Sequence, residues 1–310
     1  MADVSLSVVI PVYNSEGTLE ALVRRLQPVL SAQASRAEVI LVNDGSRDGS
    51  WDVICRLARE HAWVRGIDLM RNYGQHNALL AGIRGARHDV IVTLDDDLQN
   101  PPEEIPKLLE KLAEGYDVVY GTPEKERQPF WRTIASNATK LAMKSTMGVD
   151  SARDVSAFRA FRTQVRDAFT QYQALFTSID MLLTWGTTRF VSIPVRHDAR
   201  TVGASNYTFR TLLTHTLNMV TGFSVLPLQL ASLIGFAFTV FGFGVLVYVV
   251  GRYVLWGSSV PGFPFLASVI AIFSGAQLFA LGIMGEYLAR MHFRVMGQPT
   301  YTVRSSTPQR

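Results

Sequence analysis

Cysteine is almost absent from this chain, which has Cys55 alone among its 310 residues. A single cysteine excludes an internal disulfide, and a reducing compartment is compatible with it. The N-terminal stretch MADVSLSVVIPVYN also lacks the basic segment and long apolar run that a secretory signal peptide has. We therefore expect the first domain to remain in the cytosol.

Charge is nearly absent from one long part of the chain. Between Thr211 and Gly285, Arg252 is the only Asp, Glu, Lys or Arg. Within this part, residues 226–250 and 265–285 are apolar over about the length that crosses a ~30 Å hydrocarbon core. We predict a transmembrane helical hairpin that ends at residue 290. The alternative is a pair of buried core helices, which the length and lack of charge of both runs disfavour.

The net charge of +4 is too small to indicate a nucleic-acid partner, and the placement of the basic residues is more informative. The positive-inside rule predicts that both termini and the N-terminal domain lie in the cytoplasm, at the inner (cytoplasmic) membrane. Residues 206–225 are apolar with scattered polar side chains and predict amphipathic helices at the membrane surface. Residues 291–310 then form a cytosolic tail. The basic residues that flank the hairpin are Arg196, Arg200, Arg210, Arg290, Arg294 and Arg304.

Residues 1–205 predict a different architecture. Short apolar runs rich in β-branched residues alternate with amphipathic helical segments, which is typical of βαβ units around a mostly parallel sheet. The predicted fold class is therefore α/β and Rossmann-like. The predicted strands are 5–12, 38–46, 64–70, 89–94, 116–121 and 189–199, and the predicted helices are 15–30, 50–61, 74–86, 102–115 and 129–150.

Several predicted strands end in polar residues. The first ends in PVYN, with Glu16 close behind, the second ends in NDGS, and the fourth ends in DDD. In a parallel α/β sheet, ligands bind outside the carboxyl ends of the strands. We therefore expect these residues to line one crevice, where Tyr13 can stack on a base and Asp44 can accept hydrogen bonds from base N–H groups.

The aspartate run in VIVTLDDDLQNPPEEIP needs a compensating positive charge, because like charges packed at a strand end repel one another. Two carboxylates spaced like Asp95 and Asp97 can hold Mg²⁺ or Mn²⁺, an ion that keeps waters and takes phosphate oxygens as further ligands. We predict a metal bound to a diphosphate here. The alternative is a solvated acidic turn that caps the helix beginning near Pro102. The polar ends of the neighbouring strands favour the metal site.

Ordered motifs carry a resemblance to a known family: VVIPVYNSEGTL, VNDGSRDGS, RNYGQHNALLAGI, LDDDLQNPPEEIP and EGYDVVYGT. With the apolar hairpin ending in GEYLAR, they resemble the family-2 glycosyltransferases of the GT-A fold, and among them the membrane-bound polyprenyl-phosphate glycosyltransferases. That group includes undecaprenyl-phosphate glucosyl- and formamidoarabinosyl-transferases and dolichol-phosphate mannose synthases. Residues 71–106 are most similar to the arabinose-transferring branch.

The resemblance implies an inverting transfer from a nucleotide sugar, whose diphosphate binds the metal, to a polyprenyl phosphate that attacks the anomeric carbon. A UDP-linked donor, an undecaprenyl phosphate acceptor and a homotetramer are expected on the same ground. Asp96 lies where relatives commonly have alanine. The resemblance assigns the metal to Asp95 and Asp97, a catalytic role to Asp97, and nucleotide-sugar binding to Pro11, Tyr13, Glu16, Asp44, Asp95, Asp96 and Gln99.

On the acceptor side, the chain departs from the family pattern in two places. Relatives carry an aspartate before an FR or LR pair as a base or acceptor-orienting group. In SARDVSAFRAFR the candidate is Asp154, and the alternative is an aspartate that only caps a helix. The family segment R-x-x-G-x-S-K-Y appears here as RTVGASNY, with Asn206 at the lysine position, which weakens attraction for phosphate. The predicted acceptor-phosphate contacts are Arg159, Arg200, Ser205 and Arg210.

Other interpretations stay open for a few residues and for the function. His76 is expected to pack or hydrogen-bond near the sugar pocket, Arg71 to contact phosphate or solvent, and Lys125 and Arg127 to belong to a lid or a solvated loop. A processive polysaccharide synthase of the same superfamily would carry a QxxRW motif, which the sequence lacks. A noncatalytic membrane scaffold or flippase-associated subunit is the remaining alternative.

Overall fold

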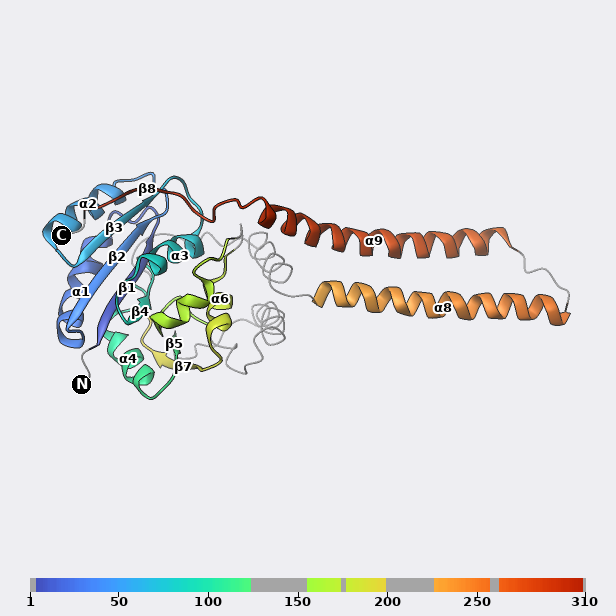
Figure 1. Ribbon diagram of the computed structural model, residues 1–310, viewed down its shortest axis with the longest axis horizontal. Coiled ribbons are helices and arrows are strands. Elements are labelled where there is room, and N and C mark those ends of the chain that lie inside the picture. Colours follow the sequence, from blue (N-terminus) through green and yellow to red (C-terminus); the bar gives the residue numbers. More distant parts are fainter. Residues whose placement is uncertain (1–3, 124–154, 174–176, 199–225, 257–261, 309–310) are drawn as a thin grey trace. The chain divides into compact units, whose positions relative to one another are not determined.

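The structure, a computed structural model, forms two compact units, Met1–Thr208 with Gly297–Arg310 and Phe209–Met296. The predicted helix 129–150 and the predicted surface helices 206–225 lie outside the described residues. The structure describes residues 4–123, 155–173, 177–198, 226–256 and 262–308 (Figure 1).

The first unit is built on a mixed, mostly parallel sheet, which confirms the predicted α/β class. In the described part of the chain its strand order is β7-β5-β6-β4-β1-β2-β3-β8 (Figure 1). Strands β1 to β4 are mutually parallel neighbours, and β5 pairs with β7 in parallel. The predicted strands are confirmed to within a few residues as β1 (Ser5–Val12), β2 (Arg36–Asn43), β3 (Val64–Leu69), β4 (Val90–Thr93), β5 (Val118–Pro123) and β7 (Phe190–Val195).

The sequence did not predict β6 (Arg159–Arg162) or β8 (Val303–Ser306), and both are antiparallel to their neighbours. β6 lies between β4 and β5, and β8 pairs with β3 at the edge of the sheet. Each has four residues, and β8 is exposed along its length, so neither shows the apolar pattern that identifies a longer strand.

Helices cover both faces of this sheet. α1 (Leu19–Gln33), α2 (Ser50–Glu60) and α4 (Ile105–Ala113) share one core with the face that carries Val8 and Ile10. α3 (Gln75–Gly85) and α6 (Ile179–Gly186) lie on the other face, where Val9 meets Gly82. This division follows from the alternation of side chains along β1. Short 3₁₀ segments, η1 (Pro102–Glu104) and η3 (Thr163–Phe169), complete the described helices of this unit.

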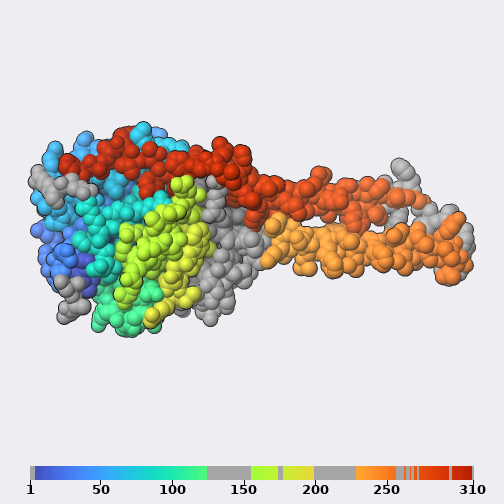
Figure 2. Space-filling model, in the orientation of Figure 1, coloured from blue at the N-terminus to red at the C-terminus, as the bar shows by residue number. Residues whose placement is uncertain are grey.

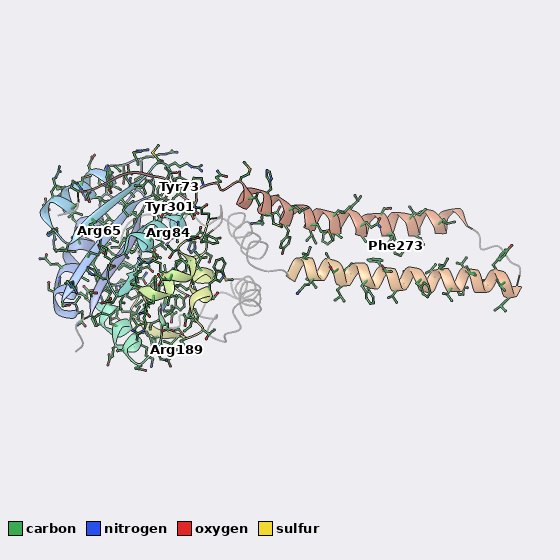
Figure 3. All side chains as sticks on the ribbon, in the orientation of Figure 1. Arg65, Tyr73, Arg84, Arg189, Phe273 and Tyr301 are labelled. Carbon is green, nitrogen blue, oxygen red and sulfur yellow. The ribbon has the colours of Figure 1, made fainter. Side chains whose placement is uncertain are left out.

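The second unit contains two long apolar helices, α8 (Leu226–Trp256) and α9 (Phe263–Val295), which run beside each other (Figure 2). Phe273 lies between them (Figure 3), and its ring centroid is 5.7 Å from that of Phe238. Leu228–Leu255 and Ile272–His292 have mean hydropathies of 2.4 and 1.3, and no residue of their most apolar windows is buried. Both helices are long and apolar enough to cross a membrane, and their exposure argues against the alternative of buried core helices.

Substitution of Gly82 tests the close contact between α3 and the sheet. A Cβ at this position would lie 2.3 Å from Cγ1 of Val9 and 3.0 Å from Cγ2 of Val42. We expect Gly82→Ala to lower the free energy of unfolding by about 1–3 kcal/mol through overpacking, despite the better helix propensity of alanine. Thermal unfolding of the detergent-solubilised full chain measures this change. Gly17→Ala is the control, because no atom lies within 4 Å of its added Cβ; equal stability of the two variants would contradict the tight contact.

Candidate functional site

The carboxyl ends of β1, β2 and β4 meet at one edge of the sheet, as the sequence predicted. The backbone N–H of Asp44, after β2, donates to the carbonyl of Val12 at the end of β1 over 2.9 Å. The N–H of Tyr13 donates to Oδ2 of Asp96, after β4, over 3.3 Å. These bonds connect the three loops directly, so a ligand at this edge can contact all of them.

The loops after β1 and β2 hold each other in place. Asn14, whose φ of 53° lies in the left-handed region that Asn tolerates, donates its N–H to Oγ of Ser46 and accepts from the N–H of Arg47. Oε2 of Glu16 accepts the N–H of Gly49, just before α2, over 3.0 Å. The Tyr13 side chain remains 46% exposed on this fixed loop, as stacking on a base requires.

Asp44 is buried and fixes the loop after β3. Its Oδ1 accepts the backbone N–H of Tyr73 over 2.7 Å, and its Oδ2 accepts that of Gly74 over 2.8 Å. Burial raises the pKa of Asp44, and these two hydrogen bonds act in the opposite direction. Each carboxylate oxygen has a second lone pair, so the predicted contact with base N–H groups is compatible with this arrangement.

The three aspartates form a tight turn after β4. Gln75 donates Nε2–H to Oδ1 of Asp95 over 2.6 Å, and the N–H of Gln99 donates to Oδ1 of Asp97 over 3.1 Å. Leu98 has a φ of 63°, which a branched residue adopts only under constraint from its surroundings. The turn therefore keeps the carboxylates together at the edge where the other loops meet.

Electrostatic repulsion is strong in this turn. Burial, followed by the charges of Asp97 and Asp96, raises the pKa of Asp95 to about 7, although Arg159 and the hydrogen bond from Gln75 oppose the rise. Burial also raises the pKa of Asp96, against hydrogen bonds from Ser15 and the N–H of Tyr13. Bringing a cation to this corner would relieve the repulsion between the carboxylates.

The oxygen ligands of this turn fit a divalent cation that is shared with a substrate. Among the described residues, no group of three or more His, Cys, Asp or Glu side chains is arranged to enclose a metal ion. Asp95 and Asp97 alone cannot complete a coordination shell, whereas Mg²⁺-type ions commonly use one or two carboxylates together with waters and substrate phosphates. The residues present therefore suit a metal that binds with a diphosphate.

Arg159, in β6, lies beneath the aspartate turn and is only 1% exposed. Its guanidinium forms an ion pair with Asp180 of α6, and its Nε donates to Oγ1 of Thr93 over 3.1 Å. The predicted contact with an acceptor phosphate needs an accessible guanidinium, and the structure places this one inside the fold instead. Its charge acts on the site by lowering the pKa of Asp95.

Other predicted residues are placed as follows. Pro11 lies within β1 opposite Val42, and Nδ1 of His76 accepts the N–H of Ile179 at 3.4 Å. The guanidinium of Arg71 stacks over the ring of Tyr73 at 4.7 Å. Two features were not predicted from the sequence. Gln75 is marked there only by its place beside His76, and the pairing of Arg159 with Asp180 has no local signal. Outside the described residues lie Lys125, Arg127, Asp154, Arg200, Ser205 and Arg210.

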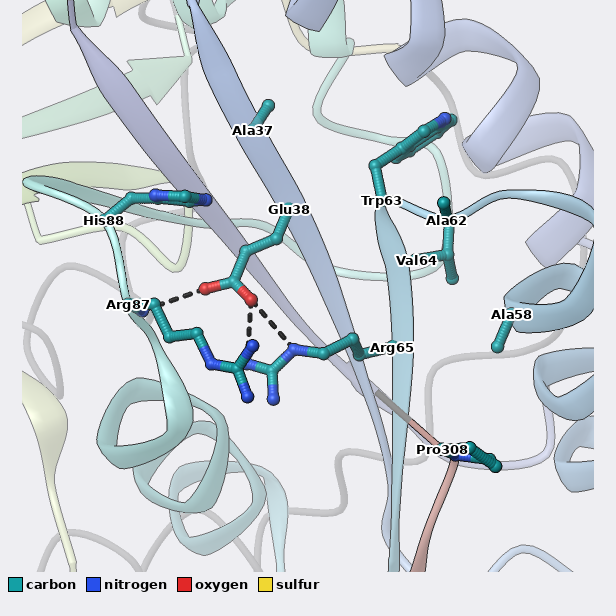
Figure 4. A pocket seen from close by; sticks show the side chains of 10 residues that line it. All are labelled: Ala37, Glu38, Ala58, Ala62, Trp63, Val64, Arg65, Arg87, His88 and Pro308. Carbon is teal, nitrogen blue, oxygen red and sulfur yellow. Dashed lines mark hydrogen bonds and ion pairs between the residues drawn. The ribbon is translucent and has the colours of Figure 1, made fainter. Parts of the chain in front are cut away.

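A cavity of about 180 Å³ lies at the opposite ends of the strands (Figure 4). Glu38 and Arg65, near the starts of β2 and β3, form an ion pair of 2.8 Å in its wall, and the N–H of Arg87 donates to Glu38. This cavity is at the amino ends of the parallel strands. It is therefore separate from the site formed by the carboxyl ends.

The raised pKa of Asp95 predicts a pH-dependent stability. The pKa of Asp95 is about 7 in the folded state and 3.8 ordinarily, so between these pH values the folded state binds more protons than the unfolded state. The free energy of unfolding therefore falls as the pH rises through this window. In EDTA, we expect Asp95→Asn to stabilise the protein by about 1–4 kcal/mol at pH 8 and by much less near pH 4.

Thermal unfolding of the full chain at both pH values measures this difference. Asp52→Asn, which alters an exposed carboxylate of α2, is the control. An equal gain for Asp95→Asn at both pH values would show that the repulsion in the turn is small.

Comparison with known proteins agrees with this geometry. The profile of Glycosyl transferase family 2 matches residues 7–171, which span β1 to the end of η3. The undecaprenyl-phosphate 4-deoxy-4-formamido-L-arabinose transferase of Pseudomonas paraeruginosa is 37% identical over 301 residues, which cover 96% of this chain and 89% of the relative. The match thus extends through both units.

Solved structures of glucosyl-3-phosphoglycerate synthase from Mycobacterium tuberculosis share the fold. The complex with Mn²⁺, UDP and phosphoglyceric acid has a TM-score of 0.52 and 17% identity, covering 71% of this chain and 77% of the other. The complex with Mn²⁺ and UDP-glucose has a TM-score of 0.51 and 16% identity, covering 71% and 78%. The predicted GT-A fold and glycosyltransferase class are thereby confirmed, and this chain belongs to glycosyl transferase family 2.

Proposed function

We propose that this protein transfers a sugar from a UDP-linked donor to undecaprenyl phosphate at the cytoplasmic face of a membrane. The observation that carries the proposal is the aspartate turn after β4, which faces the loops of β1 and β2 at one edge of the sheet. The 37% identical relative is an undecaprenyl-phosphate 4-deoxy-4-formamido-L-arabinose transferase, so that sugar is the first donor to test.

On the donor side, Tyr13 offers an exposed ring for the base and Asp44 offers carboxylate oxygens at the end of β2. Asp95 and Asp97 would hold Mg²⁺ or Mn²⁺ together with the donor diphosphate. The ion, when bound, supplies positive charge to the leaving diphosphate. Gln75 holds Asp95 in orientation, and the partly buried Gln99 lies beside Asp97, in the position predicted for a sugar or metal contact.

The transfer itself makes limited demands on acid–base catalysis. A phosphate oxygen of the acceptor forms a bond to the anomeric carbon while the bond from that carbon to the diphosphate oxygen breaks. Because the second pKa of a phosphate monoester is about 6, the nucleophile is largely ionised at neutral pH. Asp154 is then proposed as an acceptor-orienting group or base, and Arg200, Ser205 and Arg210 as acceptor-phosphate contacts.

The membrane part fits a lipid-linked acceptor. α8 and α9 present exposed apolar surfaces of sufficient length to span a bilayer, and the basic residues on either side of the hairpin predict that both termini are cytoplasmic. A noncatalytic scaffold has no need for the concentrated, mutually repelling carboxylates of the aspartate turn. The homotetramer suggested by the family resemblance stays a prediction.

Asp97→Asn tests the metal role. Loss of one carboxylate ligand should lower kcat/KM by about 100- to 1000-fold because the leaving diphosphate loses charge stabilisation. The assay measures UDP release from UDP-sugars by the full chain in detergent with Mn²⁺ and undecaprenyl phosphate. Asp52→Asn serves as a matched control on the exposed surface of α2. Normal turnover by Asp97→Asn would show that Asp97 is not a ligand of a catalytic metal.

Membrane orientation has its own test. In a Cys55→Ser background, a membrane-impermeant maleimide should label Ser258→Cys, in the loop between the helices, on intact cells. It should label Gln309→Cys only after permeabilisation, because the positive-inside rule leaves the tail in the cytoplasm. Labelling of both positions on intact cells would contradict the predicted orientation.

A further inference from the structure

The C-terminal segment 300–307 returns to the sheet and lies along β3. The N–H of Met70 donates to the carbonyl of Thr302 over 2.9 Å, and Gly66 and Thr307 exchange hydrogen bonds of 2.9 and 3.0 Å. Thr300 and Thr307 are buried at the two ends of the segment. The segment is therefore a firmly held edge of the domain, next to the loop that follows β3.

The first connection from this segment to the donor site passes through Tyr73. A hydrogen bond from the Thr302 side chain, supported by Arg71, lowers the pKa of the Tyr73 phenol. Arg84 stacks over the ring of Tyr301 at 5.6 Å, and Tyr73, Arg84 and Tyr301 lie in the same corner of the domain (Figure 3). The backbone N–H of Tyr73 donates to Asp44, so this tyrosine connects the segment, at its phenol, with Asp44, at its backbone.

The second connection passes through Arg304. Its guanidinium lies 3.5 Å from Oδ2 of Asp68 and donates to the carbonyl of Met70 over 2.8 Å. Asp68 is only 3% exposed, and its Oδ1 accepts Nδ2–H of Asn43 over 2.7 Å. Oδ1 of Asn43 accepts the N–H of Ser46 over 3.3 Å. Ser46 also accepts a hydrogen bond from Asn14 in the loop after β1. This series of contacts therefore connects the C-terminal segment with the loops after β1 and β2.

We propose that the C-terminal segment 300–307 is a positioning element of the donor site, in which Arg304 and Thr302 hold the loops around Asp44 for nucleotide binding. Among the described residues, Arg304 is the only cation that forms an ion pair with the buried carboxylate of Asp68, so its removal should weaken the orientation of Asn43 by Asp68. Without the Thr302 hydroxyl, the Tyr73 phenol keeps only Arg71 of its two side-chain hydrogen-bond partners, so the loop that contacts Asp44 is held less firmly. The donor-site part of this inference rests on the proposed function.

The position of the segment in the chain gives the contact a functional consequence. Residues 296–301 are all that separate the end of α9 at Val295 from Thr302. The donor site is thus complete only after the chain has passed through the apolar hairpin and returned to the sheet. Under this proposal, nucleotide binding depends on a segment that follows the hairpin in the chain.

The test uses the full chain in detergent, with UDP and Mn²⁺ as the probe in calorimetric titrations. We expect Arg304→Ala and Thr302→Val each to weaken UDP binding by about three- to tenfold, the range for a partly exposed charged contact or one hydrogen bond. Arg304→Lys should restore most of the affinity. Arg56→Ala is the control, because Arg56 is an exposed arginine that pairs with Glu20 and Glu60, and this variant should leave the affinity for UDP unchanged.

Two further measurements separate positioning from general destabilisation. In steady-state assays, the KM for the donor should rise while kcat and the KM for undecaprenyl phosphate stay constant. In amide hydrogen exchange, Arg304→Ala should speed exchange at residues 43–46 and 71–74 and leave the α1 amides protected.

The outcomes are distinguishable. If Arg304→Ala leaves amide hydrogen exchange unchanged at residues 43–46 and 71–74, the inference is overturned, whether or not the chain binds a nucleotide. Faster exchange with unchanged UDP affinity would overturn the link to the donor site. If the wild-type chain binds no nucleoside diphosphate, the proposed function fails and the donor-site part fails with it.

Discussion

The repulsion among three carboxylates at the end of β4 is the interaction on which the site depends. Burial, together with this repulsion, raises the pKa of Asp95 to about 7, and the buried Arg159 and the amide of Gln75 offset only part of the rise. A divalent cation shared with a diphosphate would compensate the charge, and the loops around the turn meet at that edge of the sheet, where such a ligand would bind.

The parallel sheet makes such a corner available. Because β1, β2 and β4 run in the same direction, their carboxyl ends present Tyr13, Asp44 and the aspartate turn together. Most of the hydrogen bonds that shape the corner involve a backbone N–H group and a carboxylate, hydroxyl or amide oxygen of another loop. This arrangement fixes the loops while leaving the Tyr13 ring exposed. The polar residues that hold the loops in place are thus the same ones that we propose to contact the ligand.

Much of this could be predicted from local patterns. The strands from β1 to β5, the helices between them and the convergence of three polar strand ends follow from hydrophobic periodicity and from the rule for parallel sheets. β6 and β8 could not be predicted, because four-residue antiparallel strands carry too short a pattern. The placement of Arg159 was also hidden, since an FR pair in sequence does not show whether its arginine faces solvent or, as here, the carboxylate of Asp180.

The sequence by itself determined the α/β class, the apolar hairpin and the chemistry of the acidic turn, because each depends on residue types repeated or clustered within a short stretch. Only the tertiary structure decided which distant residues support that turn. Arg159 reaches it from a strand inserted between β4 and β5, and Arg304 contacts Asp68 of β3 and Met70 just after that strand from the far end of the chain. Such contacts join residues separated by tens to hundreds of positions, and only the folded sheet brings them within hydrogen-bonding distance.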